Sequence, residues 1–124
     1  MTINEAITRL DALKFNTYDE ADKIEWLSRL DSAVKLQIID KYVGAENVSF
    51  NGYDSNTPLE TVLLVPAPYD EVYLRWMEAQ IDYHNGEYDK FNNSIIMYNT
   101  AFQAYQNHYI EKHSPVQRGR RFLF

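Results

Sequence analysis

The chain contains no cysteine, which excludes disulfide bonds, thiolate nucleophiles and cysteine-ligated zinc or iron-sulfur sites. It also lacks any run that approaches the roughly 20 apolar residues needed by a membrane-spanning helix. The amino terminus begins MTINE and has neither the basic start nor the apolar stretch of a signal peptide. These absences predict a soluble cytoplasmic protein that does not enter a membrane.

Motifs for catalysis and cofactor binding are missing as well. None of the four glycines recurs with the spacing of a phosphate-binding loop, and no serine stands in a nucleophile-elbow sequence. The histidines are His84, His108 and His113, and the last two are five residues apart, whereas helical zinc ligands prefer a spacing of three or four. We therefore expect no catalytic residue, no metal, no cofactor and no enzymatic activity.

Carboxylates are frequent, and the pattern favours an ordinary role for them. Acidic residues on the expected helices, among them Asp11, Asp31, Asp40 and Glu78, are interpreted as the solvated face. An acid-base pair would require two carboxylates in one desolvated cleft, and nothing in the sequence indicates such a pair.

The residues that are present indicate one folded domain. Hydrophobic residues make up 45% of the 124 residues, and ten are tyrosines, which is too much apolar material for a disordered chain. Charge is unevenly spread, since residues 1–110 carry 8 Lys/Arg against 17 Asp/Glu and residues 111–124 carry 4 against 1. An acidic body disfavours general nucleic-acid binding and makes protein partners the expected ones.

Two amino-terminal helices are expected. Thr2 and Glu5 match a capping box, and the stripe that follows consists of Ile3, Ala6, Ile7, Leu10 and Leu13. A second capping box at 17–20 predicts a longer helix that ends near Gly44. Its apolar stripe consists of Ile24, Leu27, Leu30, Val34 and Ile38.

Residues 45–67 break the helical pattern. Val48 and Phe50 alternate with polar residues, and Asn51-Gly52 is a turn signal. The segment is predicted to be a β-hairpin or extended loop that projects from the helical body. It could either cover the core or contact a partner, and the sequence leaves both possibilities open.

Two further helices are predicted after Pro66-Ala67-Pro68, and they meet at Gly86. The first has apolar residues at Tyr69, Val72, Trp76, Ala79 and Tyr83. The second has a heptad-like seam at Tyr88, Phe91, Ile95, Tyr98, Phe102, Tyr105 and Tyr109. Because the two seams are out of phase, the chain should turn at Gly86 into an antiparallel pair, which is the predicted core. An aromatic ligand pocket is the less favoured interpretation of the seam.

The sequence therefore predicts a mainly helical, all-α fold, an antiparallel bundle of about four helices. Residues 1–113 would form the single domain, and residues 114–124 would form a basic and hydrophobic arm. The arm contains Arg118, Arg120, Arg121, Phe122 and Phe124. It could be a frayed end without a role or could dock on a neighbouring subunit.

Several runs resemble the head-tail connector (head completion, adaptor) proteins of tailed bacteriophages and prophages. They are INEAITRLD at 3–11, DKIEWL at 22–27, FNGY at 50–53, LLVPAPYD at 63–70, AQIDY at 79–83 and NGEYDKFNNS at 85–94. Together they span most of the chain up to about residue 113, although none is a chemical motif.

The resemblance implies a structural virion assembly protein. Its subunits would form an oligomeric ring of about twelve copies under the portal, as closed symmetry allows. The ring would bind the portal protein and tail or stopper proteins, and DNA would only pass through its channel. The protein would be found in the cytoplasm of the bacterial host during assembly and then in the virion. The expected interface residues are Phe50, Asn51, Gly52 and Tyr53 in the loop and Arg118, Arg120, Arg121, Phe122 and Phe124 in the arm. The alternative is a small cytoplasmic protein-protein binding module or regulator without catalysis.

Overall fold

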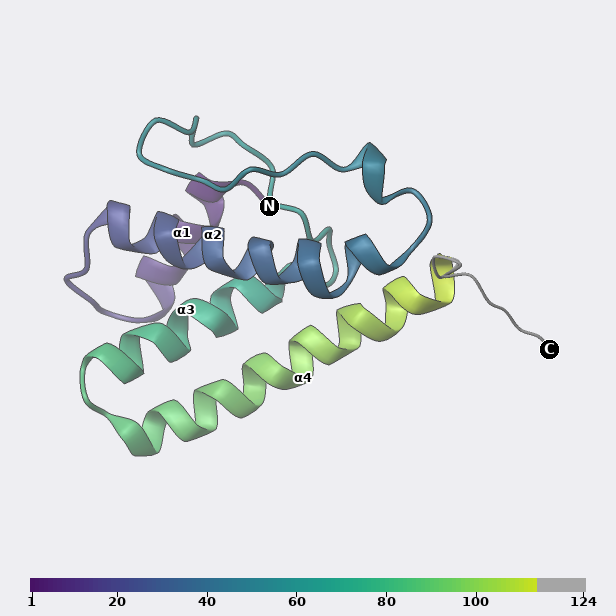
Figure 1. The fold of residues 1–124 in the computed structure, drawn as a ribbon. Helices are drawn as coiled ribbons and strands as arrows, with labels where there is room; N and C mark the ends of the chain where they lie inside the picture. The colour runs from purple at the N-terminus through teal and green to yellow at the C-terminus, as the bar shows by residue number, and fades with distance from the viewer. Residues whose placement is uncertain (114–124) are drawn as a thin grey trace.

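The computed structural model describes residues 1–113, and these form a mainly helical fold (Figure 1). The elements are α1 (Ile3–Leu13), α2 (Glu20–Gln37), the short 3-10 helices η1 (Ile39–Lys41) and η2 (Ala45–Asn47), α3 (Glu71–His84) and α4 (Tyr88–Lys112). The predicted all-α class with four helices is thus confirmed. Within this part of the chain the only β-type pairing is a single bridge between Thr2 and Val62, so the hairpin alternative for 45–67 is not present there.

Helix α1 begins as its sequence predicts. The Glu5 backbone N–H donates to Thr2 Oγ1 at 3.1 Å, and Glu5 Oε1 accepts from the Thr2 backbone N–H at 2.9 Å. These bonds from Thr2 lower the pKa of Glu5. Four of the five stripe residues are buried, but Leu13 is 63% exposed. The buried stripe ends at Leu10, one turn before the helix itself ends and the chain becomes extended at Lys14.

The second predicted capping box is wrong. Helix α2 begins after Asp19, which makes no side-chain capping bond, and Thr17 lies outside the helix. The Tyr18 N–H instead donates to Asn16 Oδ1 at 3.2 Å, which holds this stretch in a local turn. All five apolar stripe residues of α2 are buried. The helix ends at Gln37, before Gly44, because the chain tightens into η1, and Gly44 (φ 98°) then precedes η2.

Helices α3 and α4 form the predicted antiparallel pair. The chain reverses between them at Gly86, whose φ of 75° lies in the left-handed region that suits glycine (Figure 1). The turn at Gly86 and the two helices on either side of it are therefore confirmed.

The core lies elsewhere than predicted. Helix α3 is the central element, and most of its circumference is buried through Val72, Tyr73, Leu74, Met77, Ala79 and Ile81. These side chains meet the buried faces of α1 and α2. In α4 only Tyr105 and Tyr109 are buried, and Tyr88 is 61% exposed. The α4 seam is only partly buried because this helix forms an outer layer against α3.

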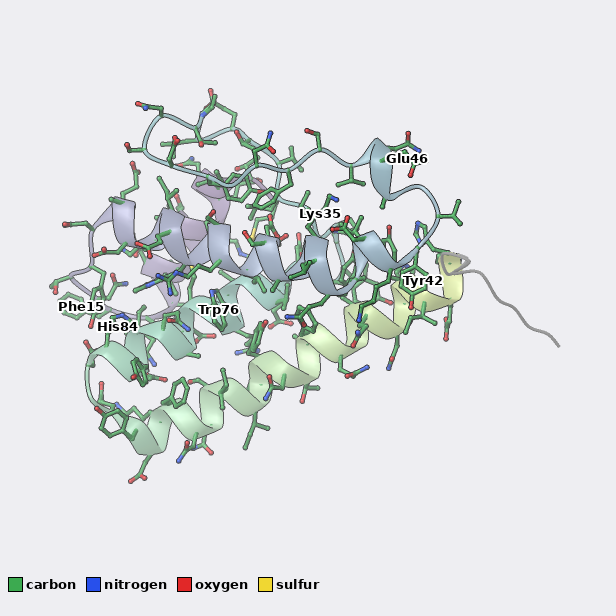
Figure 2. The ribbon with its side chains drawn as sticks, viewed as in Figure 1. Phe15, Lys35, Tyr42, Glu46, Trp76 and His84 are labelled. Atoms are coloured by element: carbon green, nitrogen blue, oxygen red, sulfur yellow. The ribbon has the colours of Figure 1, made fainter. Side chains whose placement is uncertain are left out.

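Trp76 joins the layers. Its Nε1–H donates to the backbone carbonyl of Trp26 on α2 at 2.8 Å. On the other side its ring lies 4.9 Å, centroid to centroid, from that of Tyr98 on α4. Figure 2 shows Trp76 on α3, between α2 and α4. This residue therefore fixes α3 between the inner and outer layers.

The central position of α3 can be tested with two matched methionine truncations. Met77 is fully buried on α3, whereas Met97 is 48% exposed on α4. We expect Met77→Ala to lower the free energy of unfolding by about 2–5 kcal/mol, because it leaves a cavity. Met97→Ala should change it by about 0.5 kcal/mol or less. Urea denaturation measures both values, and equal losses would contradict the described layering.

Candidate functional site

The carboxylate of Asp31 is the most unusual polar group in the described fold. It lies on α2 with 0% exposure, so its assignment to the solvated face was wrong. Its Oδ2 accepts hydrogen bonds from the Tyr53 hydroxyl at 2.5 Å and from the Leu64 N–H at 3.1 Å. Its Oδ1 accepts a bond from the Tyr73 hydroxyl at 2.6 Å. One side chain thus joins α2, α3 and two separate points of the long loop, which is the segment 48–70 between η2 and α3.

The protonation of this cluster follows from burial. Desolvation raises the pKa of Asp31, and the bonds from Tyr53, Tyr73 and Leu64 oppose that rise without cancelling it. Burial and the neighbouring Asp31 charge raise the pKa of Tyr53 and Tyr73 above the ordinary tyrosine value. Both phenols therefore remain protonated donors. Because Asp31 and Tyr73 are fully enclosed, a substrate has no access to them, and the cluster acts as a structural fastening.

The first half of the loop is fastened to the outside of α2. The Tyr53 N–H donates to Ser28 Oγ at 3.0 Å. Gly52 has φ 93°, and a Cβ at that position would lie 3.4 Å from Ser28 Oγ. A side chain at residue 52 would therefore strain the backbone and crowd Ser28. In Figure 1 the loop runs above α2 along much of its length.

The second half of the loop is fastened to the amino terminus and to the core. The Ile3 N–H donates to the Thr61 carbonyl at 3.0 Å, and the Leu63 N–H donates to the Met1 carbonyl at 2.9 Å. The Val65 N–H donates to the Tyr73 hydroxyl at 2.7 Å. Leu63 and Val65 are buried, so this half of the loop covers the core.

The predicted loop interface residues divide into two groups. Asn51 and Gly52 are exposed, and Phe50 is half-buried with its ring edge against the Tyr53 ring, 5.0 Å away. Tyr53 is an internal anchor, since both its N–H and its hydroxyl bind α2. A partner-binding role for these four residues stays a prediction. The predicted arm residues, Arg118, Arg120, Arg121, Phe122 and Phe124, lie outside the described residues.

A second buried carboxylate, Asp82, joins α3 to the α1–α2 connection and to α4. It lies on α3 with 0% exposure, and Lys14 Nζ is 2.6 Å from its Oδ1. The Ser94 hydroxyl on α4 donates to Oδ2 at 2.6 Å. This ion pair holds the α1–α2 connection against the α3–α4 pair.

Sequence reasoning missed both buried carboxylates, although a signal existed. Asp31 lies four residues after Leu27 and three before Val34, so it falls on the buried stripe of α2. Asp82 follows the buried Ala79 by three residues, so it also falls on a buried face of α3. An acidic residue at the spacing of an apolar stripe indicates a buried, hydrogen-bonded carboxylate. This spacing could have been recognised in the sequence.

The three histidines contact aromatic rings. His84 Nδ1 lies 3.0 Å from the Gln80 carbonyl, and its ring meets the edges of Tyr18 and Trp26. His108 stacks on Tyr69 and His113 on Tyr109. Within residues 1–113 no group of three or more histidine and acidic side chains is placed to hold a metal ion. None of the described helices is long and apolar enough to cross a membrane.

Removing one hydroxyl should loosen the loop. We expect Tyr53→Phe to lower the free energy of unfolding by about 1.5–3 kcal/mol, because Asp31 loses a hydrogen bond to its buried carboxylate. The same change should speed proteolytic cleavage between residues 48 and 57. Tyr83→Phe is the control, since Tyr83 is 53% exposed. Urea denaturation and timed proteolysis measure both effects, and an unchanged cleavage rate would show that the loop does not depend on Asp31.

The raised pKa of Asp31 also predicts a pH dependence of stability. The folded state holds the proton of the Asp31 carboxyl more tightly than the unfolded chain does. The stabilisation that results from this difference is therefore present below about pH 4 and is lost as the pH rises through the pKa of Asp31 in the folded state. The stability of the native protein minus that of Asp31→Asn should therefore decrease from pH 4 to pH 7. Urea denaturation across this range measures the difference. If this difference in stability increased with pH, the hydrogen bonds from Tyr53, Leu64 and Tyr73 would have to lower the pKa of Asp31.

Comparison with known proteins finds no matching family model, no matching curated protein and no matching solved structure.

Proposed function

We propose that this chain is a structural assembly protein, the subunit of a head-tail connector (adaptor) ring in a tailed bacteriophage or prophage. The observation that carries the proposal is the loop fastened outside α2, whose Tyr53 hydroxyl is bound by the buried Asp31. This anchor holds Asn51 and Gly52 at the surface in a fixed position. A preorganised loop loses little conformational entropy when it binds, which suits a subunit that docks on a larger ring.

The charge distribution supports the same role. All 18 acidic residues lie in residues 1–113 with 9 of the 12 Lys/Arg, so this part carries a net charge of −9, and residues 114–124 carry +3. An acidic body in a channel repels DNA phosphates, so the DNA can pass without binding. A basic arm with terminal aromatic residues is suited to tie one subunit to the next acidic body.

The use of the buried carboxylates supports an assembly role over catalysis. Asp31 and Asp82 are enclosed, and their oxygens are bound to side chains and backbone of other elements. A general acid or base must instead reach a substrate within hydrogen-bond distance. In this chain the two buried carboxylates hold helices and the loop in place. Partners would bind the outer surface, where neither carboxylate lies.

The proposed partners are the portal protein and the tail or stopper proteins, with about twelve copies forming a closed ring. Assembly would take place in the cytoplasm of the bacterial host, and the subunit would remain in the virion. The contacts would be formed by Phe50, Asn51, Gly52 and Tyr53 in the loop and by Arg118, Arg120, Arg121, Phe122 and Phe124 in the arm.

Native mass spectrometry of the chain, alone and mixed with a portal ring from the same phage or prophage, tests this function. We expect the portal complex to gain the mass of about one ring of copies. A variant lacking residues 115–124 should keep the melting temperature of the full chain and add fewer copies. No gain at high protein concentration would contradict the connector role and favour a binding module with one stable partner. Loss of the fold in the shortened variant would contradict the role of the arm.

A further inference from the structure

Asn51 is followed by Gly52 in the exposed part of the long loop, and this pair of residues is chemically labile. Asparagine is among the thermolabile residues of proteins, because its side-chain amide can react with the backbone nitrogen of the next residue. A glycine in the next position leaves that nitrogen unhindered, since glycine has no Cβ. The chain has a second pair of this kind, Asn85-Gly86, at the turn between α3 and α4.

Hydrogen bonds restrain the second pair. The Gly86 N–H donates to the Tyr83 carbonyl at 3.0 Å, so the nitrogen that would react is already engaged. The Tyr18 hydroxyl donates to Asn85 Oδ1 at 2.6 Å, which holds the side-chain amide in one orientation. A reaction at Asn85 therefore requires the loss of the Gly86 bond and a reorientation of the bonded amide, and both steps cost free energy.

The first pair carries no such restraint. Within residues 1–113 neither the Gly52 N–H nor the Asn51 side chain forms a hydrogen bond, and both residues are exposed. The next N–H along the chain, that of Tyr53, is the one that donates to Ser28 Oγ. Thus no hydrogen bond has to break before the Asn51 side chain can reach the Gly52 nitrogen.

The fold also requires the glycine that makes this pair labile. Gly52 has φ 93°, and a Cβ at this position would lie 3.4 Å from Ser28 Oγ. A larger residue would slow the reaction by crowding the backbone nitrogen, but it would strain the backbone that leads to the Tyr53 anchor. The local structure therefore favours the labile pair over a protected one.

We propose that Asn51 is a site of spontaneous deamidation and that the fold protects Asn85 from the same reaction. The Gly52 nitrogen loses its proton to hydroxide and forms a bond to Asn51 Cγ. The Cγ–Nδ2 bond then breaks, and the leaving nitrogen takes a proton from water and departs as ammonia. Water opens the resulting cyclic imide. Opening at Cγ gives aspartate, whereas opening at the main-chain carbonyl gives isoaspartate, in which the backbone runs through the side chain.

Either product changes the part of the loop that faces solvent. Residue 51 lies two positions before Tyr53, whose N–H and hydroxyl both bind α2. Isoaspartate lengthens the backbone beside this anchor, and both products place a negative charge where a neutral amide stood. A consequence for docking rests on the proposed function: a modified subunit would bind the portal ring less well, because the contact surface has changed in charge and shape.

Peptide mapping of the aged full-length protein tests the assignment. The folded protein is incubated at mildly alkaline pH and digested with trypsin, which places Asn51 in the peptide 42–75 and Asn85 in the peptide 76–90. Mass spectrometry with fragmentation locates the modified residue in each peptide. We expect Asn51 to react at least about tenfold faster than Asn85, since one or two ordinary hydrogen bonds change a rate by such a factor. Equal rates, or a faster reaction at Asn85, would overturn the proposal.

Two controls separate the effect of the fold from that of the local sequence. In urea both pairs lose their surroundings, so the two rates should become similar, and a difference that persisted would show that the fold does not set it. Tyr18→Phe removes the hydroxyl that holds the Asn85 amide. This variant should speed the reaction at Asn85 severalfold and leave that at Asn51 unchanged. An unchanged rate at Asn85 would overturn the protective role of the Tyr18 hydrogen bond.

The two proposals can fail separately. Selective reaction at Asn51 without a ring on the portal would keep the modification site and remove the connector function. A ring on the portal, with Asn51 reacting no faster than Asn85, would do the reverse. When aged protein is mixed with the portal ring, the bound copies should contain less modified Asn51 than the copies left in solution. Equal contents would overturn the effect of the modification on docking.

Discussion

The position of the long loop depends on one buried carboxylate. Asp31 accepts hydrogen bonds from Tyr53, Leu64 and Tyr73, which belong to the two halves of the loop and to α3. Each donor would be left without a partner in a nonpolar environment if the carboxylate were absent. Because these bonds converge on one side chain, the loop, α2 and α3 cannot shift independently. The exposed residues at 51–52 are therefore presented by a fixed backbone, on which the proposed docking role depends.

The layering of the helices assigns different tasks to α3 and α4. Helix α3 is buried on most of its circumference and holds the inner layer together through residues such as Met77. Helix α4 lies outside it and buries only Tyr105 and Tyr109. Its residues 91–110 include no Asp, Glu, Lys or Arg. The stability of the domain thus resides mainly on α3 and the faces packed against it.

Much of the fold could be predicted because local interactions set it. The capping box of Thr2 and Glu5, the left-handed Gly86 and the stripe of α2 each depend on residues within one or two helical turns. The failures concern where a helix begins and which residues of an apolar stripe are covered. Helix α2 begins only at Glu20, so Thr17 lies outside it and the predicted capping box did not form. Leu13 follows the apolar stripe of α1 but is 63% exposed.

The sequence alone determined the class of the protein: four helices, an acidic body, an irregular segment between the second and third helices, and no cysteine chemistry. These properties follow from composition and from periodicities that need no knowledge of neighbours. Only the tertiary structure decided which residues lie inside. It placed Asp31 and Asp82 in the interior, left Phe15 in solvent and made α3 the central helix. The physical reason is that burial depends on which faces meet across the chain, and a helical stripe specifies a face without specifying its partner.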